Sequence, residues 1–139
     1  MGPHSFKVKA ARAAGGQHCF VFISCEKDQI NPALVSYLGN GVNVVQEGAS
    51  EWNNDTEYSD SRQYERYDVS DENCDECELE RKILEQAEHL REAKYRIDNY
   101  GAILGPNSNT FARQLIEGSG GKVNPRPDVY GWSYVRPIF

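Results

Sequence analysis

The chain has 139 residues, a length typical of a single domain with its own hydrophobic core. Hydrophobic residues make up 39% and charged residues 26%, and the formal net charge is -6. This negative charge repels a phosphate backbone, so we expect no nucleic acid partner. No apolar stretch approaches the roughly 20 residues that a membrane-spanning helix needs, so we expect a chain that does not span a membrane.

The N-terminus gives no signal for export. Residues 1–16 carry basic side chains but no apolar core region, so we expect no secretory signal peptide. An exported activity would need another route, such as delivery as the tail of a larger protein. We divide the chain into this N-terminal segment, residues 1–16, and a single domain, residues 17–139.

Two neighbouring segments near the N-terminus predict different structures. Residues 6–14 are rich in alanine and basic side chains, which favours a short helix ended by Gly15-Gly16. In residues 17–25 both alternating sets of side chains are mostly apolar, which indicates a strand at the centre of a sheet, buried on both faces. His18 lies near the start of this strand, next to a loop.

The middle of the chain predicts short strands joined by polar connections. Asparagine, proline and glycine turn signals make residues 26–41 a connection. Residues 42–47 predict a second strand, residues 48–63 a polar loop, and residues 64–69 a third short strand.

A long amphipathic helix is predicted next. Ser70 is a good N-cap, and the acidic residues directly after it suit the positive end of a helix that runs to about Ile97. Glu78 and Lys82 lie four residues apart on the outer face of this helix. Its apolar stripe consists of Ile83, Leu84, Ala87, Leu90 and Ile97.

The C-terminal third predicts a short helix and an extended tail. The helix covers residues 108–117 and is closed by Gly118. Residues 119–139, rich in glycine, proline and aromatic side chains, predict an ordered extended segment with a last strand near residues 133–135. The order of elements favours an α+β fold with a small, mostly antiparallel sheet packed on helices.

Ser108 is the first candidate for chemistry. Helical spacing places Ser108, Phe111, Ala112 and Leu115 on one face, which we expect to be buried. Ser108 would then lie at a helix N-terminus, where free backbone N–H groups attract an anion and offer an oxyanion site beside a nucleophile. The alternative is structural, because serine and asparagine are preferred N-caps and residues 107–110 read Asn-Ser-Asn-Thr.

A serine nucleophile needs a base, and the chain has three histidines. His4 lies near the N-terminus, and His89 lies mid-helix on a charged face that we expect to be solvated. His18 starts a buried strand beside a loop, where a ring can be both oriented and reachable. We therefore select Ser108 and His18 as the catalytic pair; the alternative for a histidine at a strand end is a structural role.

The four cysteines allow a different kind of site. Cys74 and Cys77 form a C-x-x-C pair, and Cys19 and Cys25 lie six residues apart on the predicted central strand. Four thiolates suit zinc, but six residues of strand span about 20 Å, so Cys19 and Cys25 cannot share one ion. We expect no metal and no cofactor. For Cys74 and Cys77, buried or free thiols, a bond to another cysteine and redox activity remain the alternatives. A nucleophile at Cys74 or Cys77, with His18 as its base, is a further alternative to Ser108.

Two segments resemble a known superfamily. Residues 100–116, which include Gly-Pro-Asn-Ser-Asn-Thr-Phe at 105–111, resemble the nucleophile segment of circularly permuted papain-like hydrolases, relatives of NlpC-type cell-wall peptidases and of the lecithin retinol acyltransferase group. Their pattern is an Asn-Cys pair, a spacer, a phenylalanine and an apolar helix, with a histidine-led strand earlier in the chain, as His18 leads residues 18–23 here. The Gly-Pro-Asn-Ser-Asn version is similar to domains at the C-termini of Rhs-type polymorphic toxins.

This resemblance implies a permuted papain-like fold in which Ser108 occupies the position of the nucleophilic cysteine. It implies that Ser108 attacks an ester or amide carbonyl, that His18 accepts the proton and returns it to the leaving group, and that the Ser108 N–H and a neighbouring donor hold the oxyanion. Serine lacks the low pKa of a thiol, so it depends fully on its base. Strand pairing makes Gln46 or Glu47 the candidates for orienting His18.

The resemblance further implies a bacterial toxin or effector that is secreted or delivered into a target cell. Its substrate would be a lipid ester or a cell-wall peptide, and a cognate immunity protein would be a partner. One alternative is a catalytically silent binding module of the same fold. The other is a zinc or redox module that uses the four cysteines.

Overall fold

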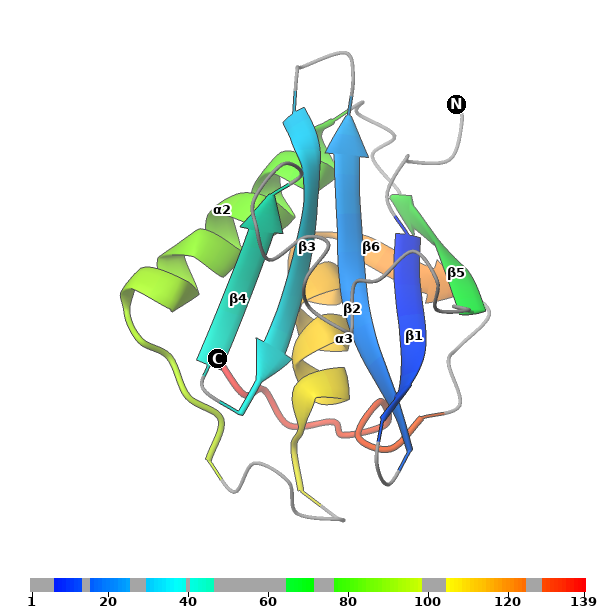
Figure 1. Cartoon of the computed structure of the whole chain (residues 1–139), viewed down its shortest axis with the longest axis vertical. Helices are drawn as coiled ribbons and strands as arrows, with labels where there is room; N and C mark the ends of the chain where they lie inside the picture. Colours follow the sequence, from blue (N-terminus) through cyan, green and yellow to red (C-terminus); the bar gives the residue numbers. More distant parts are fainter. Residues whose placement is uncertain are drawn as a thin grey trace.

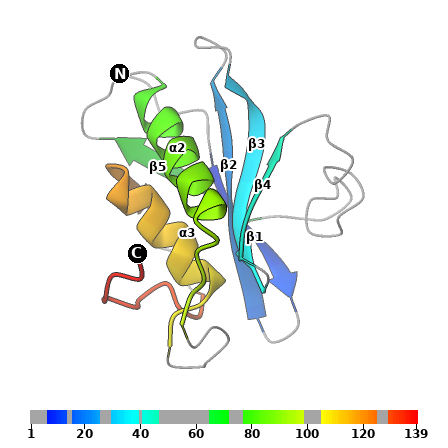
Figure 2. The ribbon, with the colours of Figure 1, turned by 90° about the vertical axis from the view of Figure 1, so that its left-hand side faces the viewer.

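In the residues that it describes, a computed structural model of the chain shows a six-stranded antiparallel sheet with two helices on one face (Figures 1 and 2). It describes residues 7–13, 16–25, 30–39, 41–46, 65–71, 77–98, 105–124 and 129–139. The strands are β1 (Lys7–Ala13), β2 (Gly16–Cys25), β3 (Ile30–Leu38), β4 (Gly41–Gln46), β5 (Glu65–Asp71) and β6 (Gly121–Asn124), and the helices are α2 (Glu78–Glu92) and α3 (Ser108–Gly118). The predicted α+β class is confirmed. Within these residues, no helix has the length and apolar character needed to cross a membrane.

The central place of β2 follows from its sequence. The strand order is β4-β3-β2-β1-β5-β6, and each neighbouring pair is antiparallel. Cys19, Val21 and Ile23 lie in the core beneath the helices, while Phe20 packs with Leu34 on the opposite face. A strand that is apolar on both sides is stable only where both faces are covered, so the predicted central strand is confirmed.

The two helices cover the same face of the sheet, as Figure 2 shows. α2 packs mainly on β4, and α3 packs on β3, β2 and β6. The predicted outer pair Glu78–Lys82 is present, with 3.0 Å between its charged atoms. Of the predicted stripe, Ile83, Ala87 and Leu90 are buried within α2.

The helix predicted for residues 6–14 is wrong, because Lys7–Ala13 forms β1. β1 pairs with β2 on one side and β5 on the other, so that Val8 lies opposite both Val21 and Tyr67. Backbone pairing on both sides outweighs a helix preference worth roughly a few tenths of a kcal/mol per residue. The strand also brings part of the predicted N-terminal segment into the sheet of the main domain.

The connection predicted for residues 26–41 is wrong over most of its length, because Ile30–Leu38 forms β3. The strand buries Val35 and Tyr37 in the main core. Pro32 lies near its start, where the missing N–H of proline is tolerated. The glycine signal at residues 39–41 marks the turn between β3 and β4, where Leu38 pairs with Gly41.

The other predicted strands of the middle segment are confirmed. Residues 42–47 correspond to β4, and residues 64–69 correspond to β5. The loop predicted for residues 48–63 lies outside the described residues.

α2 begins later than the sequence predicts. Ser70 is not its N-cap but lies in β5, opposite Lys122 of β6. The N-cap is Cys77, and the helix ends at Glu92. Ile97 lies beyond the helix, buried, with its N–H donated to the Tyr37 hydroxyl at 2.9 Å. A capping residue and acidic neighbours therefore do not start a helix where sheet pairing already uses the backbone.

The C-terminal strand also differs from the prediction. The last strand in the described part of the chain is β6, and residues 133–135 are not in a strand. Residues 129–139 form an ordered segment beside α3, as expected (Figure 1). Gln114 of α3 holds this segment, donating from Nε2 to the Arg136 carbonyl at 2.7 Å and accepting from the Ile138 N–H at 2.8 Å.

A disulfide joins the end of β2 to the start of α2. It links Cys25 and Cys77, whose Cα atoms are 5.8 Å apart, within the range that a disulfide needs. Both side chains are buried, and 52 residues separate them in the chain. Cys77 has a left-handed backbone with φ of 69°, which is uncommon for a residue other than glycine. The cross-link therefore fixes the N-terminus of α2 against the end of β2.

We expect the Cys25→Ser/Cys77→Ser double variant to lose about 2–5 kcal/mol of unfolding free energy relative to the oxidised wild type. Urea unfolding with and without a thiol reductant measures this loss. Reductant should lower the stability of the wild type and leave that of the double variant unchanged. A non-reduced digest in which Cys25 and Cys77 are not cross-linked would contradict the assignment.

Tyr95 anchors the C-terminus. Its ring packs edge-on against Tyr37 and Phe139, at centroid distances of 6.5 and 5.9 Å, and its hydroxyl donates to the Ile138 carbonyl. Burial raises the pKa of Tyr95 to about 12, and the nearby Tyr37 and Asp98 act in the same direction. The neutral phenol is therefore the form that the fold favours.

Because the pKa of Tyr95 is raised from 10.0 to about 12, the folded protein keeps this proton where the unfolded chain has lost it. This contribution to stability is fully present below pH 10 and is lost as the pH rises from 10 to 12. We expect the unfolding free energy of the wild type to fall more steeply over that range than that of Tyr95→Phe, as measured by urea unfolding. If the unfolding free energies of the wild type and Tyr95→Phe fall in parallel with pH, Tyr95 does not cause the loss of stability.

Candidate active site

Strands β2 and β3 stop pairing with each other before either strand ends. Their pairing stops at Val21 and Val35. Beyond these residues, β2 continues to Gly16 along β1, and β3 continues to Leu38 along β4. We call residues 16–20 of β2 and 36–38 of β3 the fork; the diverging ends are visible at the lower edge of the sheet in Figure 1, near the first turn of α3.

Asn109, in the first turn of α3, contacts the fork directly. Its Oδ1 accepts the backbone N–H of Cys19 at 2.7 Å, and its Nδ2 donates to the carbonyl of Tyr130 at 2.9 Å. The residue is only 3% exposed. A side-chain amide therefore takes the place of a strand partner at this point of β2, and fixes the N-terminus of α3 against the strand.

Ser108 is the first residue of α3 and is 8% exposed. The predicted helix face is confirmed, because Phe111, Ala112 and Leu115 are buried in the main core. Ser108 therefore lies at the edge of that core, directly beside the residue that contacts the fork.

His18 directly precedes Cys19 in β2, and its backbone lies opposite Ala11 of β1. The Asn109–Cys19 hydrogen bond thus joins the residue after Ser108 to the residue after His18. This path limits the distance between the Cα atoms of Ser108 and His18 to at most about 13 Å. Alternation along β2 places His18 on the sheet face of Phe20, opposite to the face that α3 covers, so the hydrogen bond brings the two backbones near each other without placing His18 on the side of Ser108. Of the other histidines, His89 is exposed on α2 as expected, and His4 lies outside the described residues.

Asn107 caps the helix on which Ser108 lies. Its Oδ1 accepts the N–H groups of Asn109 and Thr110 at 2.9 and 3.2 Å, and Thr110 Oγ1 accepts the Asn107 N–H at 3.1 Å. The structural alternative of a helix cap is therefore confirmed for Asn107. The expectation that these N–H groups are free for an anion is wrong for Asn109 and Thr110, because the cap uses both.

A tight turn at residues 130–131 packs against the N-terminus of α3. Thr110 Oγ1 donates to the Gly131 carbonyl at 2.7 Å, and Asn107 Nδ2 donates to the Tyr130 carbonyl at 3.0 Å. Gly131 has φ of +88°, and a Cβ there would collide with the side-chain amide of Asn107. Only glycine fits this position without displacing the cap.

Gln46, one of the two predicted partners of His18, does not lie beside it. β4 pairs with β3 and not with β2, and Gln46 lies opposite Ala33, which in turn lies opposite Ile23. Gln46 is therefore two strands away from β2 and about 16 Å along it from His18. Glu47 lies outside the described residues. The prediction assumed a hairpin of residues 17–25 with 42–47, and β3 occupies the place between them.

Cys25 and Cys77 form a disulfide, so they are not the zinc ligands of the alternative hypothesis. The ligand atoms of Cys25, Cys77 and Glu80 lie within 4.8 Å of one another, and all three residues are buried. Zinc needs thiolates, and two sulfurs bonded to each other supply none. Cys19 is fully buried at the other end of β2, and Cys74 lies outside the described residues. A bond to another cysteine is thus the outcome for Cys77.

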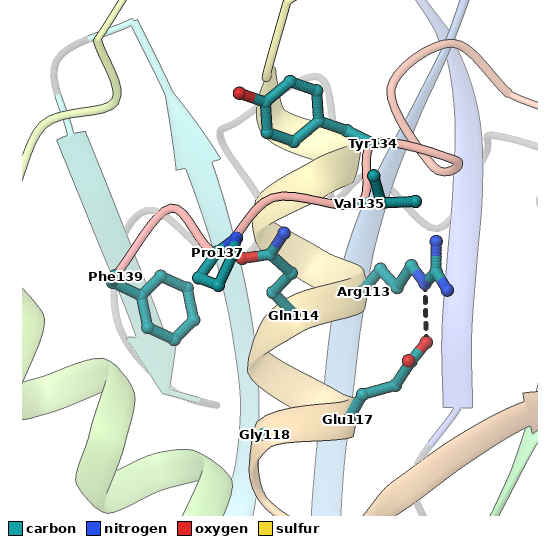
Figure 3. A pocket seen from close by; sticks show the side chains of 8 residues that line it. All are labelled: Arg113, Gln114, Glu117, Gly118, Tyr134, Val135, Pro137 and Phe139. Atoms are coloured by element: carbon teal, nitrogen blue, oxygen red, sulfur yellow. Dashed lines mark hydrogen bonds and ion pairs between the residues drawn. The ribbon is translucent and has the colours of Figure 1, made fainter.

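Three surface pockets lie along the outer side of α3, where it borders α2, β6 and the C-terminal segment. Their volumes are about 420, 600 and 460 Å³. Figure 3 shows the first, between α3 and the C-terminal segment, where Arg113 forms an ion pair with Glu117 at 2.6 Å. Val135 and Phe139 form its apolar side. Ser108 lines none of these three pockets, because it lies at the inner edge of the helix.

Comparisons of the chain with protein-family models, with curated proteins and with solved structures found no match. The resemblance of residues 100–116 to a nucleophile segment therefore rests on the motif and stays a prediction.

The sequence also indicates that Asn109 is a buried, hydrogen-bonded residue, although the prediction did not select it. Helical spacing places Asn109 on the same side as Ala112 and Ile116, which are buried. A buried amide must pair both its oxygen and its nitrogen, so an asparagine on an apolar helix face predicts two hydrogen bonds with other segments. The identity of those segments, β2 and the turn at Tyr130, depends on the tertiary fold.

We expect Asn107→Ala to lower the unfolding free energy by about 1 kcal/mol through loss of the cap. Gly131→Ala should lower the unfolding free energy more than Gly120→Ala does. Both glycines have a positive φ, but only at Gly131 would a Cβ collide with the side chain of Asn107, whereas at Gly120 it meets open space. In the Asn107→Ala background, the extra cost of Gly131→Ala should disappear. Urea unfolding of the single and double variants measures this coupling, and additive costs would contradict the contact.

Proposed function

We propose that this chain is a hydrolase or acyltransferase domain with a permuted papain-like arrangement, in which Ser108 is the nucleophile and His18 is the base. The observation that supports the proposal is the Asn109–Cys19 hydrogen bond, which brings the residue after Ser108 next to the residue after His18. Two segments that the motif selects independently, 90 residues apart in the chain, thus meet at the fork.

In the proposed reaction His18 accepts a proton and then donates it, once while the acyl-serine forms and once more while it is released. Ser108 Oγ attacks the carbonyl carbon of an ester or amide while His18 takes the hydroxyl proton. His18 then gives that proton to the leaving oxygen or nitrogen as the carbon–heteroatom bond breaks, which leaves an acyl-serine. Water, or a second alcohol or amine, attacks the acyl group with His18 again as base and restores Ser108.

The oxyanion of this reaction needs donors other than those in the cap. The proposal assigns the Ser108 N–H as one donor. Asn107 holds the N–H groups of Asn109 and Thr110, so the second donor comes from outside the first turn of α3. Removing one such donor costs a typical acyl-transfer enzyme roughly 10²–10³-fold in rate, so this donor matters.

The disulfide supports a role outside a reducing compartment. Disulfides such as Cys25–Cys77 persist in oxidising surroundings, which suits a domain that is secreted or delivered into a target cell. By the motif, the proposed role is that of a bacterial toxin or effector with a cognate immunity protein. The substrate is a lipid ester or a cell-wall peptide, and the net charge of -6 disfavours nucleic acid.

A second candidate is a catalytically silent binding module of the same fold. The capping of α3 favours it, because Asn107 uses two of the N–H groups that an anion would need. The test below separates the two candidates. The zinc module loses support, because the disulfide removes Cys25 and Cys77 as thiolates.

A fluorophosphonate probe, which reacts with activated serines and needs no knowledge of the substrate, should modify Ser108 in the wild type. Ser108→Ala should abolish the modification, and His18→Ala should slow it about 10²–10⁴-fold because the base is lost. Peptide mass spectrometry locates the modified residue, and a rate measurement gives the slowing.

Two matched variants control for loss of structure. Ser119 lies at the other end of α3 and donates to the Leu115 carbonyl, and His89 is exposed on α2. Ser119→Ala and His89→Ala should react like the wild type. Modification that persists in folded Ser108→Ala or is equally fast in folded His18→Ala would rule out this pair, and a wild type that never reacts would favour the binding module.

Expression in the bacterial cytoplasm and, separately, in the periplasm tests the toxin role. We expect the wild type to arrest growth in one compartment, and Ser108→Ala and His18→Ala to be harmless there. Arrest in the periplasm would favour a cell-wall peptide. Growth arrest by both folded variants at the level of the wild type would show that the toxicity does not depend on this pair.

A further inference from the structure

We propose that the reduced form of this chain binds one zinc ion through Cys25, Cys77 and Glu80, and that oxidation of the two cysteines releases the ion. Cys25 ends β2, while Cys77 and Glu80 lie at the start of α2. Figure 1 shows both places at the upper end of the sheet. The site uses two cysteines and a carboxylate, in contrast to the four cysteines of the zinc module, and it does not depend on the proposed hydrolase activity.

The three ligand atoms are close together and shielded from bulk water. The two sulfurs and a carboxylate oxygen of Glu80 lie within 4.8 Å of one another. The exposed fractions are 4% for Cys25, 0% for Cys77 and 1% for Glu80. Zinc binds cysteine sulfur at about 2.3 Å, which places two sulfurs of one tetrahedral site about 3.8 Å apart. Disulfide sulfurs lie about 2 Å apart, so the reduced pair needs to separate by less than about 2 Å.

Local structure directs the three side chains to one point. The pairing of β2 with β3 shifts register between Ile23 and Cys25, an irregularity that re-aims side chains at a strand end. Cys77 is the N-cap of α2 and Glu80 follows three residues later, a spacing that brings side chains together on the first turn. Negatively charged ligands suit this place, because the N-terminus of a helix carries a partial positive charge.

Two thiolates and one carboxylate suit zinc better than the other common metal ions. Calcium and magnesium take oxygen ligands and copper(I) favours sulfur, whereas zinc binds both cysteine and glutamate. The three ligands together carry three negative charges, so a divalent cation removes most of the repulsion between them. Water completes the tetrahedral coordination, as it does in other zinc sites with three protein ligands.

The disulfide and the zinc site are alternative states of the same two sulfurs. Zinc binding converts the thiols of Cys25 and Cys77 to thiolates and releases two protons. A small-molecule disulfide then takes two electrons from these thiolates, so that the Cys25–Cys77 bond forms, the oxidant leaves as two thiolates, and the zinc ion is released. Zinc therefore joins β2 to α2 in a reducing compartment, and the disulfide joins them in an oxidising one.

The first measurement is a cobalt(II) titration of the full chain, reduced in urea and refolded without oxygen, followed by displacement with zinc. We expect one cobalt ion per chain, with the charge-transfer absorption of thiolate-bound cobalt, and no such absorption from the disulfide-bonded chain. Loss of a residue that only orients a ligand costs roughly 10–100-fold in metal affinity, so Cys25→Ser and Cys77→Ser should each lower the zinc affinity more than about 100-fold.

Glu80→Gln separates a ligand from a structural carboxylate. It keeps the size of the side chain but removes its charge, so the zinc affinity should fall at least about 10-fold. The absorption per bound cobalt should stay the same, because both sulfurs still bind. Three controls should leave the affinity unchanged: Glu85→Gln, at an exposed glutamate of α2, Cys19→Ala, at the other end of β2, and Cys74→Ser. Circular dichroism must show that each variant is folded.

X-ray absorption at the zinc edge tests the wild type without any variant. We expect two sulfur neighbours at about 2.3 Å and oxygen neighbours at about 2.0–2.2 Å. Adding a small-molecule disulfide should release one zinc ion per chain to a chromophoric chelator. If the reduced chain folds only with zinc, refolding at increasing zinc concentrations replaces the titration.

Several results would overturn the site. They are a reduced chain that binds neither cobalt nor zinc, bound zinc with any number of sulfur neighbours other than two, and equal binding by the disulfide-bonded chain. An unchanged zinc affinity in folded Cys25→Ser, Cys77→Ser or Glu80→Gln would do the same, as would loss of binding in folded Cys74→Ser. None of these results bears on whether Ser108 reacts with a fluorophosphonate.

Discussion

A backbone N–H in the interior needs an acceptor, and at the fork the side chain of Asn109 supplies it. Leaving the Cys19 N–H without a partner would cost about 1–3 kcal/mol, a large part of the stability of a domain of this size. Because β3 has turned toward β4 at this point, the acceptor must come from another element, and α3 must begin where its first turn can reach β2. The packing of Phe111 and Leu115 in the core and the turn at Gly131 follow from that placement.

Strand β2 is tied to a helix at each end. Near its start, Cys19 is bound to α3 through Asn109; at its end, Cys25 is bound to α2 through the disulfide with Cys77. The two links differ in kind. The first is a buried hydrogen bond, and the second is a covalent bond that depends on an oxidising environment. Reduction would therefore release α2 first, while α3 would keep its contact with the fork. The candidate site is thus attached to the part of the fold that does not rely on redox conditions.

The sequence predicted those elements whose side-chain pattern alone determines them. β2 is apolar on both faces, α3 has a buried stripe from Ser108 to Leu115, and both were predicted correctly. β1 and β3 were not predicted as strands, because pairing with other strands determines their structure. The alanine-rich segment 7–13 forms a strand because it pairs with β2 and β5. The segment around Pro32 forms a strand because it pairs with β2 and β4, despite its turn residues. Missing β3 also misplaced Gln46, since the assumed hairpin skipped one strand. The meeting of the α3 terminus with β2 depends on the same tertiary pairing, so only its two separate components could be predicted.

The cap on α3 determines where any reactivity of Ser108 must come from. A helix N-terminus can bind its own cap or an external anion through a given N–H, but not both at once. Asn107 already holds the N–H groups of Asn109 and Thr110, so the helix end contributes less to a negatively charged intermediate than the position of Ser108 suggests. A serine hydroxyl also starts from a far higher pKa than a thiol, so the main requirement shifts to the base. The hydrogen bond from Cys19 to Asn109 brings the backbone of His18 to the start of α3, but alternation along β2 places His18 on the other face of the sheet, so the base is the step of the proposed reaction that the described fold supports least.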